Sequence, residues 1–319
     1  MEHKVVIRNN ELDTVKFFAI LVIYTSHFVD TFCPDKAYLW HTMPTSIILS
    51  GITGKLGVAI FGVLLGYFAY IANKRLTLLE YSINRYGYFV FVGLFINIIY
   101  CTYFKMPFSN IMEVSLTVSN DIFPTYWCMR DFLFASIFCY YIGISNFKFN
   151  DRVIVILILF AIGQVWIPIC MLGVLIPELK EHALLKNRMM SCIFFLVSFW
   201  IIKRPENSLT YILDGLFAVI MLCIIENNLY LRKVLSNNVT ASLGRRTMAI
   251  FVIHPITYSI VGEYLFAHYN LSVKVIWLLC FVIICILSYP VTYIFGFYSK
   301  CVTLLYKNLR KLMAMITSE

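Results

Sequence analysis

The sequence predicts an all-α polytopic membrane protein, a bundle of about ten transmembrane helices. Of its 319 residues, 61% are hydrophobic and only 13% are charged, whereas a soluble chain carries about 25% charged residues to cover its surface. The mean hydropathy of the chain is +0.80. This composition excludes a soluble enzyme, a disordered chain and a secreted disulfide scaffold. We expect one transmembrane domain over residues 1–319.

The net charge of +9 has a particular meaning in such a chain. The basic residues lie between apolar runs, where they set orientation and attract anionic lipids or ligands, so we expect membrane lipids as partners and no nucleic acid. Most of the ten cysteines lie inside apolar runs, without CxxC spacing, and this indicates small buried hydrophobes and no metal site. The first apolar run lacks a small-residue cleavage site, so we expect no cleaved signal peptide.

Apolar runs long enough to cross a bilayer give the positions of the helices. The clear spans are 12–32, 54–72, 86–103, 126–145, 209–229, 247–266 and 275–295, and a shorter one is 189–202. The stretch 153–176 is either one long helix or two short ones broken near Gly163-Gln164 and Pro168.

The distribution of basic residues selects between these two readings, because cytoplasmic segments are enriched in Lys and Arg. Both ends of the chain are basic, with Arg8 near one and Arg310 near the other. Two cytoplasmic ends require an even number of crossings, and two helices in 153–176 give ten. This assignment leaves few basic residues in the outer loops: Lys36, Lys105, Lys203, Arg204 and Lys274.

The first span carries Lys16 and His27, although a charged side chain in hydrocarbon costs about 2.5–3.5 kcal/mol or more. They are eleven positions apart, three helical turns, so they share one face and lie about 16 Å apart along the axis. This places Lys16 in the inner third and His27 in the outer third. A structural role explains each residue equally well: Lys16 snorkels to the headgroups and His27 forms a hydrogen bond in the core.

Basic residues border the inner ends of the spans that follow. They are Lys74, Arg75, Arg85, Arg232, Lys233, Arg245 and Arg246. Their simplest role is to fix the topology, although a phosphate-rich cytosolic ligand needs such a surface. Lys55, at the outer end of the second span, most simply snorkels.

Charged residues also gather in the outer half. The fourth span reaches Arg130 and Asp131 within a turn or two of its start, and Asp214 lies in the outer part of 209–229. With His27 and Lys55 they indicate either an outward-facing polar site or a structural ion-pair network. His254 lies in the middle of 247–266, before Pro255, which frees a carbonyl for a polar neighbour; the simpler role of His254 is therefore structural.

Several stretches form an ordered set of motifs. They are Leu12-Asp13 through Lys16 to His27; Gly54-Lys55-Leu56-Gly57 through Phe61 to Gly66-Tyr67, with Leu65 where serine is usual; Trp127 through Arg130-Asp131 to Leu133; Met171-Leu172-Gly173; and Gly244 through Thr247 to His254-Pro255. In this order they resemble acyltransferase family 3, the integral-membrane O-acyltransferases of bacterial surface polysaccharides. The resemblance covers nearly the whole chain.

The resemblance implies transfer of an acyl group, most often acetyl, from cytosolic acyl-CoA to a hydroxyl of a cell-surface or lipid-linked glycan. It also implies a bacterial cytoplasmic membrane, in which the distribution of basic residues places both termini inside, and no cofactor beyond acyl-CoA. The residues it implies are His27, Lys16 and Asp13 for catalysis, Arg85 and Arg75 for the donor, and Arg130, Asp131 and His254 for the acceptor or the oxyanion. The family's donor-linked R-x-x-R has Arg85 at its first position here, but Tyr88 stands at the second.

Two other classes of protein fit the same polar residues. A transporter or exporter of a glycan or small solute also needs polar groups within its helices, but it needs no CoA site and leaves its substrate unchanged. A receptor or assembly scaffold would tolerate replacement of Lys16 and His27.

Overall fold

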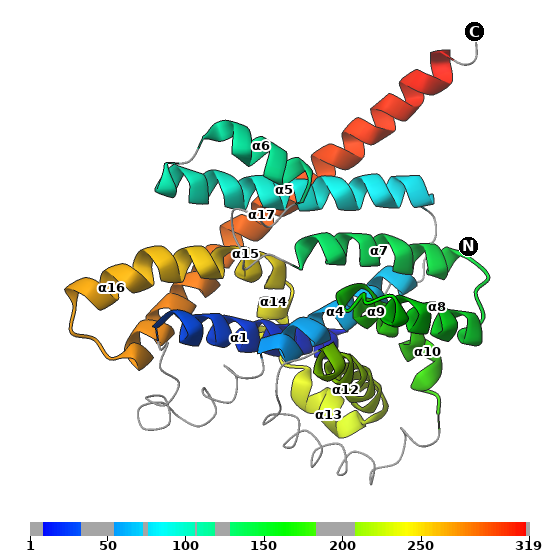
Figure 1. Ribbon diagram of the computed structural model, residues 1–319, viewed down its shortest axis with the longest axis horizontal. Helices are drawn as coiled ribbons and strands as arrows, with labels where there is room; N and C mark the ends of the chain where they lie inside the picture. Colours follow the sequence, from blue (N-terminus) through cyan, green and yellow to red (C-terminus); the bar gives the residue numbers. More distant parts are fainter. Residues whose placement is uncertain are drawn as a thin grey trace. The chain divides into compact units, whose positions relative to one another are not determined.

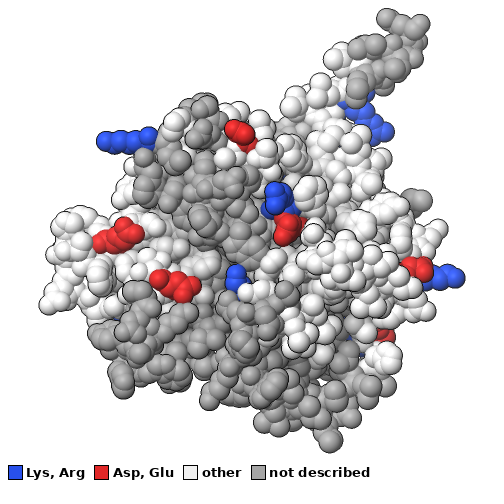
Figure 2. All heavy atoms as spheres, in the orientation of Figure 1, with Lys and Arg blue, Asp and Glu red and all other residues white. Residues whose placement is uncertain are grey.

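The structure, a computed structural model, describes residues 9–32, 54–72, 76–105, 107–118, 128–182 and 208–316, and these residues form helices and no strands. The all-α prediction is therefore confirmed for this part of the chain. Figure 1 shows the helices in sequence colours, and on the face drawn in Figure 2 most of the described surface is uncharged.

Among the described residues, six helices are long and apolar enough to cross a membrane: Asn10–Phe32, Gly54–Ile71, Leu78–Tyr103, Leu209–Asn227, Thr247–His268 and Val273–Leu312. Each overlaps a predicted span. The span predicted at 126–145 is a shorter helix, α7 (Met129–Ile144), and the run 189–202 lies outside the described residues. Large apolar side chains, such as Leu157, Ile286 and Phe297, are more than half exposed, as expected of lipid-facing surfaces.

By contacts, the chain divides into two compact units, and the first comprises the described residues of Met1–Phe61 and Ile176–Met248. Its helices are α1 (Asn10–Phe32), the first part of α4 (Gly54–Ile71), α10 (Ile176–Leu179), α12 (Ser208–Asn227), α13 (Leu229–Leu235) and α14 (Asn238–Gly244). Helix α1 is its centre and packs against α13 and α14. Ile20, Tyr24 and Phe28 of α1 are fully buried.

The second unit comprises the described residues of Gly62–Leu175 and Ala249–Glu319. Its elements are the rest of α4, α5 (Leu78–Phe104), α6 (Phe108–Leu116), α7, α8 (Phe149–Ala161), α9 (Trp166–Met171), the 3₁₀ turn η2 (Leu172–Leu175), most of α15 (Thr247–Thr257), the π-helical turn η4 (Tyr258–Gly262), α16 (Glu263–His268) and α17 (Val273–Ile316). Helix α5 packs against α6, α7 and α17.

The third span begins eight positions earlier than its apolar run predicts. Thr77 and Glu80 form a capping box: Glu80 N donates to Thr77 Oγ1 at 3.2 Å and Thr77 N donates to Glu80 Oε2 at 2.7 Å. This pair satisfies two backbone donors that a helix start leaves unpaired. Helix α5 therefore starts at Leu78, and Arg85 lies two turns inside it.

The predicted break in 153–176 is present at Gly163. Helix α8 ends at Ala161, Gly163 has a φ of +85°, and α9 starts at Trp166. A positive φ suits glycine, which has no Cβ to clash in that region. Pro168 does not interrupt a helix, because it lies in the first turn of α9, where backbone N–H groups have no partner within the helix.

Candidate functional site

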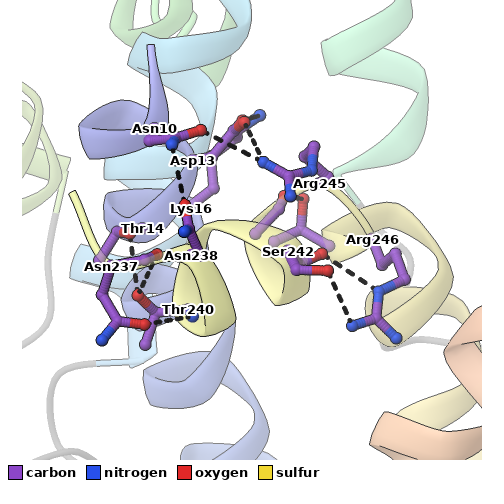
Figure 3. Close-up of polar contacts among 12 residues, drawn as sticks. Asn10, Asp13, Thr14, Lys16, Asn237, Asn238, Thr240, Ser242, Arg245 and Arg246 are labelled. Atoms are coloured by element: carbon purple, nitrogen blue, oxygen red, sulfur yellow. Dashed lines mark hydrogen bonds and ion pairs between the residues drawn. The ribbon is translucent and has the colours of Figure 1, made fainter. Parts of the chain in front are cut away.

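Asp13 lies between two cations near the start of α1. Its Oδ1 is 2.5 Å from Lys16 Nζ and its Oδ2 is 3.7 Å from Arg245 Nη1. Arg245 Nη1 also donates to Asn10 Oδ1 at 3.3 Å. Figure 3 shows these side chains converging from α1 and from the end of α14. We call Asn10, Asp13, Lys16 and Arg245 the Asp13 cluster.

The carboxylate of the Asp13 cluster is more deeply buried than its two cations. Asp13 is 3% exposed, whereas the side chains of Lys16 and Arg245 are 19% and 32% exposed. A buried carboxylate needs a cation to compensate its charge, and Asp13 has two cations within 4 Å. The sequence indicated that Asp13 orients Lys16 or Arg85; in the structure it contacts Lys16 and Arg245.

Helix α14 is fixed against α1 by capping and by further polar contacts. Asn237 Oδ1 accepts from the backbone N of Val239 at 2.8 Å and of Thr240 at 3.3 Å, which caps the N-terminus of α14. The hydroxyls of Thr14 and Thr240 are 3.0 Å apart, and Figure 3 shows this pair beside the cluster. These contacts set the register that brings the last turn of α14 to Asp13.

Gly244 permits the closest approach of the two helices. A Cβ at position 244 would overlap the backbone carbonyl of Asp13. Only a residue without a side chain fits between the helices there. The next residue in the chain is Arg245, so this contact places its guanidinium beside the Asp13 carboxylate.

Other glycines of the family-like motifs also permit close packing between helices. A Cβ on Gly57 would lie 2.7 Å from the carbonyl oxygen of Ala19, within the first unit. Within the second unit, a Cβ on Gly66 would overlap the carbonyl of Cys170, and one on Gly173 would overlap that of Val63. Small residues at such positions allow close contact between helices where lipid offers no hydrophobic driving force.

His27 lies on the same continuous helix as Lys16, so their expected separation of three turns along α1 holds. His27 is half-buried, and Lys55 at the start of α4 acts on it electrostatically. Lys55 Nζ lies 5.9 Å from the centre of the Tyr211 ring of α12. Asp214, one turn further along α12, is buried. The first unit therefore carries His27, Lys55 and Asp214, three of the residues predicted for the outer half.

The second unit carries the predicted donor residue Arg85. Its Nε donates to Tyr81 Oη at 3.0 Å, and its guanidinium lies 5.1 Å from the centre of that ring. The Tyr81 ring in turn stacks on Tyr140 of α7, with 3.9 Å between centroids. Arg85 is thus held by aromatic contacts. The second predicted donor residue, Arg75, lies outside the described residues.

The remaining predicted residues do not form one group. Arg130 is exposed and Asp131 half-buried in the first turn of α7, and no salt bridge joins these two described neighbours. His254 is fully buried, with its ring 5.7 Å from that of Phe251 and 6.0 Å from that of Tyr258. It lies one turn before η4, and π-helical turns are frequent at functional sites.

Arg152 is a buried cation for which no role was predicted. Its Nη1 donates to Tyr70 Oη at 3.1 Å and to the Val174 carbonyl at 2.9 Å, and the residue is 3% exposed. Its hydrogen bonds tie α8 to α4 and to η2, so its role is structural.

The second unit also has an apolar pocket of about 570 Å³ between α5, α7, α8 and α9. Its lining residues are Leu78, Phe134, Ile137, Phe138, Tyr141, Leu159 and Ile167. None of the predicted site residues that the structure describes is among them.

Among the described residues, no three His, Cys, Asp or Glu side chains come together to hold a metal ion. Compared with known proteins, the chain matches no family model, no curated protein and no solved structure.

Proposed function

We propose that this chain is a membrane O-acyltransferase that moves an acyl group, most often acetyl, from cytosolic acyl-CoA to a hydroxyl of a cell-surface or lipid-linked glycan. The proposal rests on the ordered resemblance to acyltransferase family 3. The observation that best supports it is the contact of Asp13 with Lys16 and Arg245, because it joins the first and last of the family-like motifs at one polar cluster.

The proposed chemistry divides between the two ends of α1. The acceptor hydroxyl oxygen bonds to the thioester carbonyl carbon, the C–S bond breaks, and the hydroxyl proton passes by way of the His27 imidazole to the CoA thiolate. An imidazole suits this step because its ordinary pKa is close to neutral. Asp13 positions Lys16, which we assign to the donor side. Arg85 and Arg75 hold the donor phosphates, and Arg130, Asp131 and His254 serve the acceptor or the oxyanion.

The membrane arrangement belongs to the same proposal. We place the chain in the bacterial cytoplasmic membrane with ten crossings and both termini in the cytoplasm. Donor and acceptor then lie on opposite sides of the bilayer, and the polar residues along α1 mark a path between them. The basic ends of the chain support this orientation.

A transfer assay with the purified chain tests the proposal. The protein is reconstituted in nanodiscs and incubated with acetyl-CoA carrying a labelled acetyl group and with glycan from the producing cell. Label in alkali-labile ester on the glycan supports the proposal, whereas unmodified glycan and intact acetyl-CoA would contradict it. Proteoliposomes that accumulate unmodified glycan would instead establish the transporter alternative. Mass spectrometry of surface-glycan esters, with and without the gene, extends the test to cells.

A further inference from the structure

The last helix is far longer than a bilayer requires. Helix α17 has 44 residues, a length of about 66 Å at 1.5 Å per residue, whereas the hydrocarbon core is about 30 Å thick. Its C-terminal part, residues 300–316, therefore lies beyond the hydrocarbon if the helix crosses steeply. Figure 1 shows this part in red, extending away from the other helices of its unit.

One side of this C-terminal part is held against α5. Arg310 Nη1 donates to Glu80 Oε1 at 3.0 Å, and Thr303 Oγ1 donates to Asn84 Oδ1 at 3.4 Å. These contacts fix the rotation of the helix about its axis. They leave the opposite side without a partner among the described helices.

That opposite side is apolar. Leu305, Leu309 and Leu312 follow one another at helical spacing and are 62%, 48% and 53% exposed. Leu304, beside them, is 65% exposed. A stripe of this size is unfavourable in water and requires a cover.

Lysines border the stripe. Lys300, Lys307 and Lys311 are separated by seven and four positions, so they form one row along the helix, and all three are exposed. Within the described part of the chain, none of them is paired with a carboxylate. A helix with one apolar side and a basic border is the type that lies in the interface of an anionic bilayer.

We propose that residues 300–316 of α17 form a membrane-surface segment that binds anionic phospholipid. The leucine stripe inserts below the headgroups and the three lysines contact the phosphates of anionic lipids. The helix reaches this position by tilting together with α5, to which Thr303 and Arg310 hold it. The proposal is independent of the acyl-transfer chemistry.

The full-length chain in nanodiscs tests this inference. A solvatochromic fluorescent amino acid replaces Leu305, and its accessibility to iodide in water and to nitroxide-labelled lipids is measured. The lipid is either phosphatidylcholine alone or the same lipid with about a third phosphatidylglycerol. We expect burial of the probe in the anionic discs and access to iodide in the neutral ones. A probe at Leu279, in the crossing part of α17, is the positional control and should be lipid-exposed in both.

Charge variants separate lipid binding from simple orientation. Each lysine near an anionic surface contributes roughly a fivefold factor, so K300Q/K307Q/K311Q should lower the docking equilibrium constant roughly a hundredfold. K300R/K307R/K311R keeps the charge and should dock like the parent. If the glutamine variant fails to insert, burial of the Leu305 probe in the parental chain is compared between neutral and anionic discs, and this comparison alone tests the proposal. A Leu305 probe that iodide reaches equally in both discs, or that is buried equally in both, would overturn the proposal.

Discussion

Gly244 of α14 lies directly against the backbone of Asp13 in α1, so closely that a Cβ on residue 244 would overlap the Asp13 carbonyl. The two helices therefore meet at the residue that pairs with Lys16 and Arg245. A change at Gly244 should act on the cluster through the backbone, without altering any charged group.

We expect Gly244→Ala to destabilise the chain by about 1–3 kcal/mol, the usual cost of overpacking, and to separate Arg245 from Asp13. Thermal unfolding of the purified protein measures the first effect. Gly296→Ala is the matched control, because its Cβ meets no atom within 4 Å; it should leave the melting temperature unchanged or slightly raise it. Equal melting temperatures for the parent and Gly244→Ala would contradict the close contact.

The pairing of Asp13 with Lys16 can be tested by a double-mutant cycle with Asp13→Asn and Lys16→Met. The pair is largely buried, so we expect a coupling energy at the upper end of the 0.5–3 kcal/mol range for contacting residues. The control cycle uses Arg310 and Glu80, whose side chains are 64% and 14% exposed, and should give less than about 1 kcal/mol. Two cycles of equal size would show that burial does not strengthen the Asp13 pair.

His27→Ala should abolish acyl transfer while leaving membrane insertion and yield close to the parent, because the imidazole is assigned to accept the acceptor's proton. Ester content of the glycan, measured by mass spectrometry, is the readout. His268→Ala serves as the control, since His268 is exposed at the end of α16, with its Nδ1 3.0 Å from the Tyr264 carbonyl oxygen. Undiminished ester in His27→Ala would remove His27 from the mechanism.

The sequence alone located most of the described helices, because an apolar run in a membrane protein is itself the physical requirement for a span. Helix ends were located less well. The start of α5 depends on the Thr77–Glu80 capping box. Helix α17 continues past its apolar run as an amphipathic helix with charged residues, and a search for apolar runs does not detect that extension. The break at Gly163 was found because glycine marks a turn.

The polar contacts were largely beyond prediction. The spacing of Asp13 and Lys16 on one helix indicates their pairing, but Arg245 and Asn10 are 235 positions apart. Only the packing of α14 on α1 brings them together, and a single sequence without aligned relatives carries no signal for that packing.

The orientation of the chain gives a prediction that depends on charge alone. Reporter fusions at residues 1 and 319 should both report a cytoplasmic location, because both ends are basic. Neutralising Lys300, Lys307, Arg310 and Lys311 together should reduce this bias at the C-terminal end. A cytoplasmic residue 1 with an outside residue 319 in the parent chain would exclude an even number of crossings.

Arg85 provides the test that separates donor binding from topology. Its guanidinium is held by Tyr81, and in the proposed function it contacts the CoA phosphates. A guanidinium–phosphate contact is charge-assisted and contributes about 1.5–3 kcal/mol. Arg85→Ala should therefore raise the acyl-CoA concentration required roughly ten- to a hundredfold, while the dependence on the acceptor stays the same. Arg85→Lys should recover only part, because an ammonium lacks the planar fork.

Tyr81→Phe refines this test, because it removes the hydroxyl that accepts from Arg85 Nε and keeps the ring stacked on Tyr140. If the hydroxyl serves to position the guanidinium, the variant should weaken donor binding by less than Arg85→Ala does and leave the melting temperature nearly unchanged. Titration of acyl-CoA against the purified variants measures donor binding, and thermal unfolding measures the melting temperature. Unchanged donor affinity in Arg85→Ala would leave Arg85 as a topology residue. The donor phosphates would then have to be sought at Arg75, Arg245 and Arg246, and Arg245 is the one that already lies beside Asp13 and Lys16.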